Sequence, residues 1–187
     1  TCSVEEIRLS LPHIELAAHL FGPQDGIPVI ALHGWLDNAN SFARLAPKLE
    51  GLRILALDMA GHGHSDHRPP GSAYGLPDYA HDVLQVAEQM GWERFSLLGH
   101  SLGAIISVIV AAAVPQRVSR LALIDGLVPP VGEPESVVER MGAALQAQLT
   151  RQSKRKPVYP DMDRAVEARM KGMVAVSRKA AELLAQR

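Results

Sequence analysis

A serine flanked by glycines two positions before and two positions after it lies near the middle of the chain. The segment Gly99-His100-Ser101-Leu102-Gly103 fits the pattern G-x-S-x-G. It follows the short apolar run 95–98 and opens the apolar run 101–114, which Pro115 ends. A serine in a sharp turn between a buried strand and a helix needs strained backbone angles and very small neighbours. We therefore predict that Ser101 is a functional residue at a helix N-terminus, where amides and the helix dipole favour negative charge, rather than part of a plain strand-to-helix turn.

The elements around this serine alternate between strand and helix patterns. Short apolar runs predict six strands, and several of these runs are continuous, as in strands buried on both faces. The predicted strands are 4–11, 14–20, 29–32, 52–57, 95–98 and 118–124, and the predicted helices are 38–49, 77–90, 101–114, 137–149 and 163–186. Such alternation indicates an α/β fold with a mostly parallel sheet and helices on both faces.

Two further motifs stand at the ends of predicted strands. His33-Gly34-Trp35 follows the run 29–32, and Asp58-Met59-Ala60-Gly61-His62-Gly63-His64-Ser65 follows the run 52–57. With the serine turn, in this order, they resemble the α/β-hydrolase-fold serine hydrolases, and among these the serine hydrolase-like proteins, over residues 4–130. The resemblance implies a hydrolase core in residues 1–129 and the start of a helical cap in residues 130–187, which would set substrate choice.

The resemblance also implies roles for individual residues. Ser101 would be the nucleophile of an ester-type hydrolase that works through an acyl-enzyme and needs neither cofactor nor metal. The backbone N–H groups of Leu102 and Trp35 would form the oxyanion hole. The Trp35 ring either lines the pocket for a small-molecule substrate or covers the core. His100 either contacts the substrate in the same pocket or packs and forms hydrogen bonds around the serine turn. His33 is expected to have only this packing and hydrogen-bonding role.

A serine nucleophile also needs a base and an orienting acid, which in this fold follow it in the order Ser, Asp or Glu, His. No histidine follows His100. Asp125, at the end of the sixth strand, stands where some family members carry their acid, although Asp also commonly ends strands. The family core has eight strands, whereas this sequence predicts six. The strand 118–124 would therefore be left as an exposed apolar edge of the sheet. We expect a longer chain or a second polypeptide to complete the sheet, and little hydrolysis by these residues alone.

Two other readings stay open. His62-Gly63-His64-Ser65-Asp66-His67 resembles the H-x-H-x-D-H zinc motif of metallo-β-lactamase-fold hydrolases, although that family needs further histidines downstream. Alternatively, the chain is a non-catalytic, hydrolase-like scaffold that binds a small molecule or a protein.

Composition excludes several other functions. The 19 Lys and Arg residues balance 20 Asp and Glu residues to a net charge of −1, and aromatic residues are 4% of the chain, so we expect no nucleic-acid partner. No apolar run reaches the roughly 20 residues that span a bilayer, so we expect no membrane partner. Cys2 is the only cysteine, which excludes an intramolecular disulfide and fits a cytoplasmic location.

Overall fold

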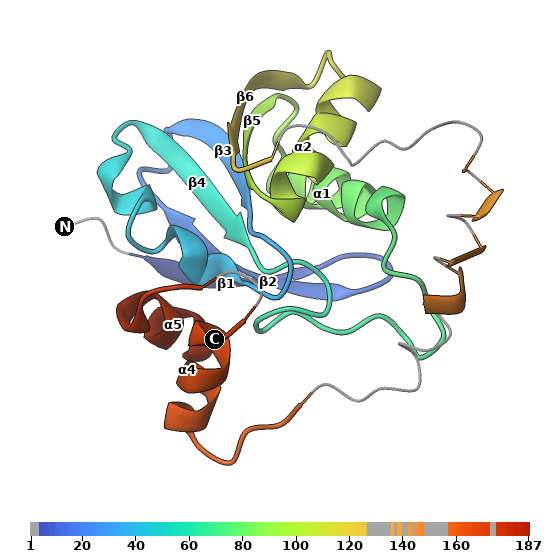
Figure 1. Cartoon of the computed structure of the whole chain (residues 1–187). Helices are drawn as coiled ribbons and strands as arrows, with labels where there is room; N and C mark the ends of the chain where they lie inside the picture. The colour runs from blue at the N-terminus through green and yellow to red at the C-terminus, as the bar shows by residue number, and fades with distance from the viewer. Residues whose placement is uncertain are drawn as a thin grey trace.

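A six-stranded sheet forms the centre of the computed structural model, which describes residues 4–126, 136, 138–139, 142–143, 145–147, 157–172 and 175–187 (Figure 1). The strands are β1 (Glu5–Ser10), β2 (Glu15–Phe21), β3 (Ile27–Leu32), β4 (Leu52–Leu57), β5 (Phe95–His100) and β6 (Val118–Ile124). Their spatial order is β1-β2-β4-β3-β5-β6. The six predicted strands are confirmed.

The sheet is parallel except at one end. Strands β4, β3, β5 and β6 are parallel neighbours, whereas β1 pairs with β2, and β2 with β4, in antiparallel fashion. Parallel neighbours need crossover connections. These are the 3₁₀ helices η1 (Ala39–Phe42) and η2 (Ala46–Lys48) after β3, α1 (Leu76–Met90) after β4 and α2 (Leu102–Ala113) after β5.

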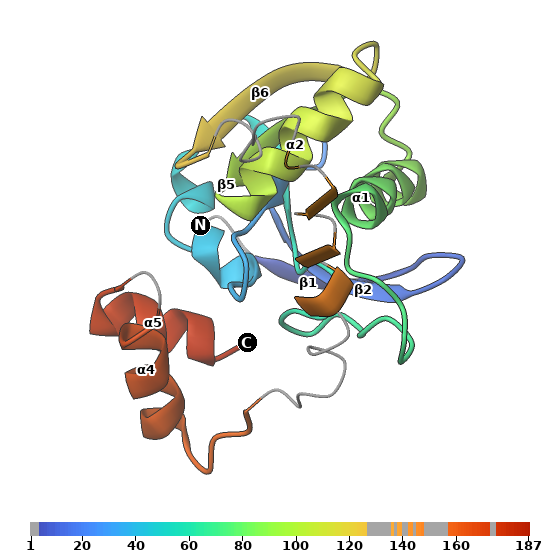
Figure 2. The ribbon, with the colours of Figure 1, turned by 45° about the vertical axis from the view of Figure 1, so that its right-hand side comes forward.

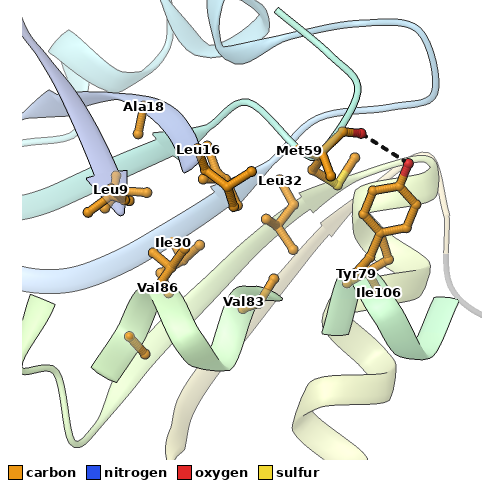
Figure 3. Close-up of a cluster of buried hydrophobic side chains, with 14 of the residues drawn as sticks. Leu9, Leu16, Ala18, Ile30, Leu32, Met59, Tyr79, Val83, Val86 and Ile106 are labelled. Carbon is orange, nitrogen blue, oxygen red and sulfur yellow. Dashed lines mark hydrogen bonds between the residues drawn. The ribbon is translucent and has the colours of Figure 1, made fainter. Parts of the chain in front are cut away.

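Both faces of the central strands are buried, which explains their continuous apolar sequence. In β3, Ile30 and Leu32 belong to the larger core cluster, together with α1 and α2 side chains such as Val86 and Ile106 (Figure 3). The intervening Val29 and Ala31 belong to a second cluster with side chains of η1 and η2. The predicted covering of both faces is confirmed.

Two helix predictions are wrong in detail. Residues 38–49 form η1 and η2 rather than one helix, because Pro47 has no N–H to donate and its ring clashes with the preceding turn. Residues 163–186 form two helices, α4 (Met162–Met170) and α5 (Arg178–Ala185). Gly172 lies in the break, and Ser177 begins the second helix because its side chain accepts from the Ala180 N–H.

Helices α4 and α5 pack together and lie apart from α1 and α2 (Figure 2). Helix α5 packs on η1, where the side-chain amides of Asn38 and Asn40 donate to the carbonyls of Leu184 and Leu183 at 2.8 and 2.6 Å. These carbonyls lie in the last turn of α5, beyond the regular helical hydrogen bonds, and the Leu184 carbonyl also accepts from the Arg187 N–H at 3.4 Å. Most of the predicted helix 137–149, the basic segment 151–156 and the boundary at 129–130 lie outside the described residues, so the division into core and cap stays a prediction.

Strand β6 lies at the edge of the described sheet. Its side chains are mostly exposed, and they include the apolar residues Leu121 and Ile124. The predicted exposed apolar edge is thus present in the described part of the chain. A search of these same residues for a helix long and apolar enough to cross a membrane finds none.

Candidate active site

Ser101 occupies the turn between β5 and α2 with φ 52° and ψ −113°. These angles lie outside the regions that non-glycine residues ordinarily adopt, so the turn is strained, as predicted. Neighbouring strands hold it in place: the Ser101 N–H donates to the carbonyl of Ile124 at 3.0 Å, and its own carbonyl accepts from Ala104 and Ile105 in the first turn of α2. The serine therefore stands at the carboxyl end of the sheet and the N-terminus of a helix.

The two motif glycines are required by close backbone contacts on either side of Ser101. A Cβ on Gly99 would lie 2.5 Å from the carbonyl oxygen of Gly103. A Cβ on Gly103 would lie 2.0 Å from the carbonyl oxygen of Leu32. Real Cβ atoms do not approach backbone atoms this closely, so the strand, turn and helix could not pack as they do with larger residues here.

The second motif forms a tight turn after β3, closed by a hydrogen bond from the Asp37 N–H to the Gly34 carbonyl at 3.1 Å. Leu36 has φ 63° in this turn. The His62 ring holds it: its Nε2 accepts from the Leu36 N–H at 3.1 Å, so Nδ1 carries the proton and donates to the Ala60 carbonyl at 3.0 Å. The Trp35 ring packs edge-on against the same imidazole. The loop after β4 thus fixes the backbone at Trp35.

His33 lies fully buried beneath this turn. Its Nε2 accepts from the Met59 N–H at 3.0 Å, so Nδ1 carries the proton and donates to the Gly34 carbonyl at 2.7 Å. Burial lowers the pKa of His33 to about 3, with a further contribution from neighbouring His62. A neutral imidazole therefore ties β3 to the loop after β4, which confirms the expected packing and hydrogen-bonding role.

Asp58 is the polar anchor of the third motif, and its side chain is fully buried. It accepts from the N–H groups of Ala39 and His64 and from the Arg187 guanidinium, at 2.7, 2.9 and 2.6 Å. A Cβ on Gly63 would lie 2.3 Å from the Asp58 carboxyl carbon, which explains glycine there. Asp58 joins the loops after β3 and β4 and the end of the chain, a role that we did not predict.

Three functional groups meet over Gly34. A Cβ built on this glycine would lie 3.2 Å from His100 Nδ1, 3.4 Å from Asp37 Oδ2 and 3.4 Å from Ser101 Cβ. His100 Nδ1 and Asp37 Oδ2 are 4.0 Å apart, and Arg169 from α4 forms an ion pair with the other oxygen of Asp37. The pairing of Asp37 with Arg169 was not predicted, because a contact across 132 positions leaves no local pattern in the sequence.

The remaining predicted residues surround this cluster. Trp35 is 47% exposed. The Leu102 N–H is one of the amides at the start of α2 that have no helical acceptor. Asp125 follows β6 directly with φ 52° and is exposed, and its neighbours Ile124 and Gly126 both contact the backbone of Ser101.

The zinc-motif histidines do not come together. Both ring nitrogens of His62 are used as described above, while His64 Nδ1 lies 2.9 Å from a Glu6 carboxylate oxygen. Within the described residues, none of His62, His64 and His67 belongs to a cluster of side chains that could hold a metal ion. In the same part of the chain, no hydrogen bond joins Ser101 Oγ to a histidine.

Comparisons with known proteins agree with this geometry. The family model described as alpha/beta hydrolase fold matches residues 27–165. A serine hydrolase-like protein of Danio rerio is 41% identical over 124 residues, covering 66% of this chain and 38% of that protein. One of Dictyostelium discoideum is 39% identical over 149 residues, covering 78% and 41%. This chain thus spans about two fifths of the length of these two relatives.

Solved structures give the same result. The crystal structure of a hypothetical protein from Pseudomonas aeruginosa PAO1 is 69% identical with a TM-score of 0.93, covering 98% of this chain and 65% of that one. A thioesterase domain from the curacin biosynthetic pathway has a TM-score of 0.79 at 23% identity, which concerns the fold alone.

Proposed function

The chain belongs to the alpha/beta hydrolase fold family, and from this premise we propose that it acts as a serine hydrolase on small carboxylic-ester-type substrates. Ser101 Oγ attacks the ester carbonyl, and the alcohol leaves with the proton that Oγ gave up. Water then hydrolyses the acyl-enzyme and regenerates the serine. The Leu102 and Trp35 amides stabilise the oxyanion, and Trp35 and His100 contact the substrate.

The observation that carries the proposal is the strained backbone of Ser101. Strain of this kind costs on the order of 1–3 kcal/mol and persists where the surrounding structure enforces it. Here β3, β5, β6 and α2 all contact the turn, and the result is a serine at a helix N-terminus, close to the loop that follows β3. A plain connection between a strand and a helix needs none of this.

No histidine follows His100 in this sequence, so none stands where the family places the base of the serine. We assign the base to a histidine carried by the remainder of a longer chain or by a second polypeptide that pairs with β6. Asp125 is the candidate acid because it lies at the end of β6, next to backbone that contacts Ser101. The site is expected to work in the cytoplasm.

A fluorophosphonate probe tests the proposal, because it reacts with activated serines. The whole native protein should be labelled at Ser101, as read by peptide mass spectrometry, and Ser101→Ala should abolish the adduct. Ser41→Ala, at an exposed serine outside the site, should leave labelling intact. The 187 residues alone should label weakly. Absence of labelling in the whole protein would contradict the proposal.

A second candidate, a non-catalytic scaffold that binds a small molecule, is favoured by one observation. His100 and Asp37 are the side chains that lie over Gly34 together with Ser101, and Asp37 is already paired with Arg169. A whole protein that fails to label, yet binds ester-like compounds with an affinity that Arg169→Gln lowers, would support this candidate.

A further inference from the structure

Two histidines and an aspartate from two elements that are distant in sequence lie close together. His13 lies in the turn between β1 and β2, while His81 and Asp82 are consecutive residues of α1. Each of the three residues offers one potential ligand atom, and these atoms lie within 4.8 Å of one another. Among the described residues, this is the one group of three or more His, Cys, Asp or Glu side chains placed to hold a metal ion. The two imidazole rings are 5.2 Å apart.

We propose that His13, His81 and Asp82 form a binding site for a divalent transition-metal ion of the zinc type. Imidazole and carboxylate are ligands that zinc takes up at about 2.0–2.2 Å, so its ligand atoms lie roughly 3–3.5 Å apart in a tetrahedral site. His13 Nε2 and Asp82 Oδ1 are already 2.8 Å apart. The remaining adjustment falls on His13 and His81, which are exposed and therefore able to turn.

Asp82 is prepared for this role by its surroundings. It is 2% exposed, and its Oδ2 accepts from the Arg68 guanidinium at 2.6 Å. The Arg68 guanidinium itself lies over the rings of Tyr74 and Tyr79, and its Cζ is 5.5 Å from the centroid of each ring. Carboxylates that bind metals are commonly fixed by such a second hydrogen bond. Arg68 thus orients Oδ1 towards His13, and it also neutralises the carboxylate, so most of the affinity must come from the imidazoles.

The site has room for further ligands. A cavity of about 400 Å³ opens beside it, lined in part by His13, Arg68, Ser72 and Asp78. Water molecules in this space can complete the coordination of the ion. Binding would fasten the β1–β2 turn to α1, at a place separate from the proposed active site, so the inference does not depend on the proposed function.

Titration of the whole protein with Zn²⁺ alone, followed by calorimetry or by competition with a chromophoric chelator, tests the proposal. We expect one equivalent to bind and to raise the melting temperature, because an ion that binds the folded state stabilises it. His13→Gln and His81→Gln should each weaken binding by about tenfold or more. His67→Gln, at an exposed histidine outside the group, should not change it.

The substitutions are placed at His13 and His81 so that a loss of zinc binding is not caused by a loss of folding. His13 and His81 are exposed, whereas a change at Asp82 would leave Arg68 without its buried partner. Melting of both variants without metal should match the parent protein. No binding by the parent, binding that survives both histidine substitutions, or binding that is lost with His67→Gln would each overturn the proposal.

Discussion

Gly103 lies so close to Leu32 that a Cβ on the glycine would stand 2.0 Å from the leucine carbonyl oxygen. This contact joins the first turn of α2 to the last residue of β3. Since His33-Gly34-Trp35 follows Leu32 directly, the packing of Gly103 places the serine turn beside the loop that carries the proposed second oxyanion amide. Two motifs that are far apart in sequence thus form one site through a backbone contact that only glycine allows.

Gly103→Ala should destabilise the fold by about 3 kcal/mol, because backbone atoms must move to make room for the methyl group. Urea unfolding followed by circular dichroism measures this change. Gly142→Ala is the matched control, since Gly142 is helical and exposed and a Cβ there meets nothing within 4 Å. It should leave the free energy of unfolding unchanged or raise it by at most about 1 kcal/mol. Equal effects of the two substitutions would contradict the packing argument.

The ion pair between Asp37 and Arg169 should hold α4 against the loop that follows β3. Both side chains are largely buried, at 9% and 23% exposure. In a double-mutant cycle with Asp37→Asn and Arg169→Gln, we expect a coupling of about 1 kcal/mol, above that of an ordinary surface pair. Hydrogen exchange should also become faster in α4 and α5 of either variant.

Arg178 supplies the control for this cycle. Its ion pairs with Asp163 and Glu182 are exposed to solvent, so Arg178→Gln should change neither the stability of the core nor exchange near Asp37. If Arg169→Gln behaves in the same way as Arg178→Gln, the contact between α4 and the loop does not hold the two together.

Buried His33 should make stability fall as the pH is lowered from 7 to 5. Its pKa in the folded state is about 3, against 6.5 in the unfolded chain, so acid protonates the unfolded form and not the folded one. The stabilisation is therefore complete above pH 6.5 and is lost progressively below it. The free energy of unfolding should fall by up to about 1.4 kcal/mol per pH unit from this group.

Urea midpoints at pH 7, 6 and 5 measure this slope, and His33→Gln should flatten it. Glu6 does not contribute in this range: hydrogen bonding to Arg187 lowers its pKa to about 2, so its own stabilisation is lost only below about pH 4.5. An NMR titration of the parent should find the His33 ring neutral throughout. Identical slopes for parent and variant, or a ring that titrates near pH 6.5, would refute this assignment.

The sheet and the serine turn could be predicted from the sequence because both depend on neighbouring residues. Strands such as β3 and β4 are continuous apolar runs, which a strand buried on both faces requires. The turn at Ser101 needs small residues at 99 and 103 wherever it occurs. The predicted helix over 38–49 failed for a local reason as well, since Pro47 interrupts a pattern whose spacing is otherwise helical.

The amino-acid sequence by itself determined the α/β fold and the serine turn. Only the tertiary structure decided which polar groups surround these elements. Arg169 reaches Asp37 across 132 positions and Arg187 reaches Asp58 across 129, while His13 meets Asp82 across 69. Such pairs depend on how helices and loops pack against the sheet. Since charged residues occur throughout any soluble surface, no spacing along the chain distinguishes the ones that packing will bury together.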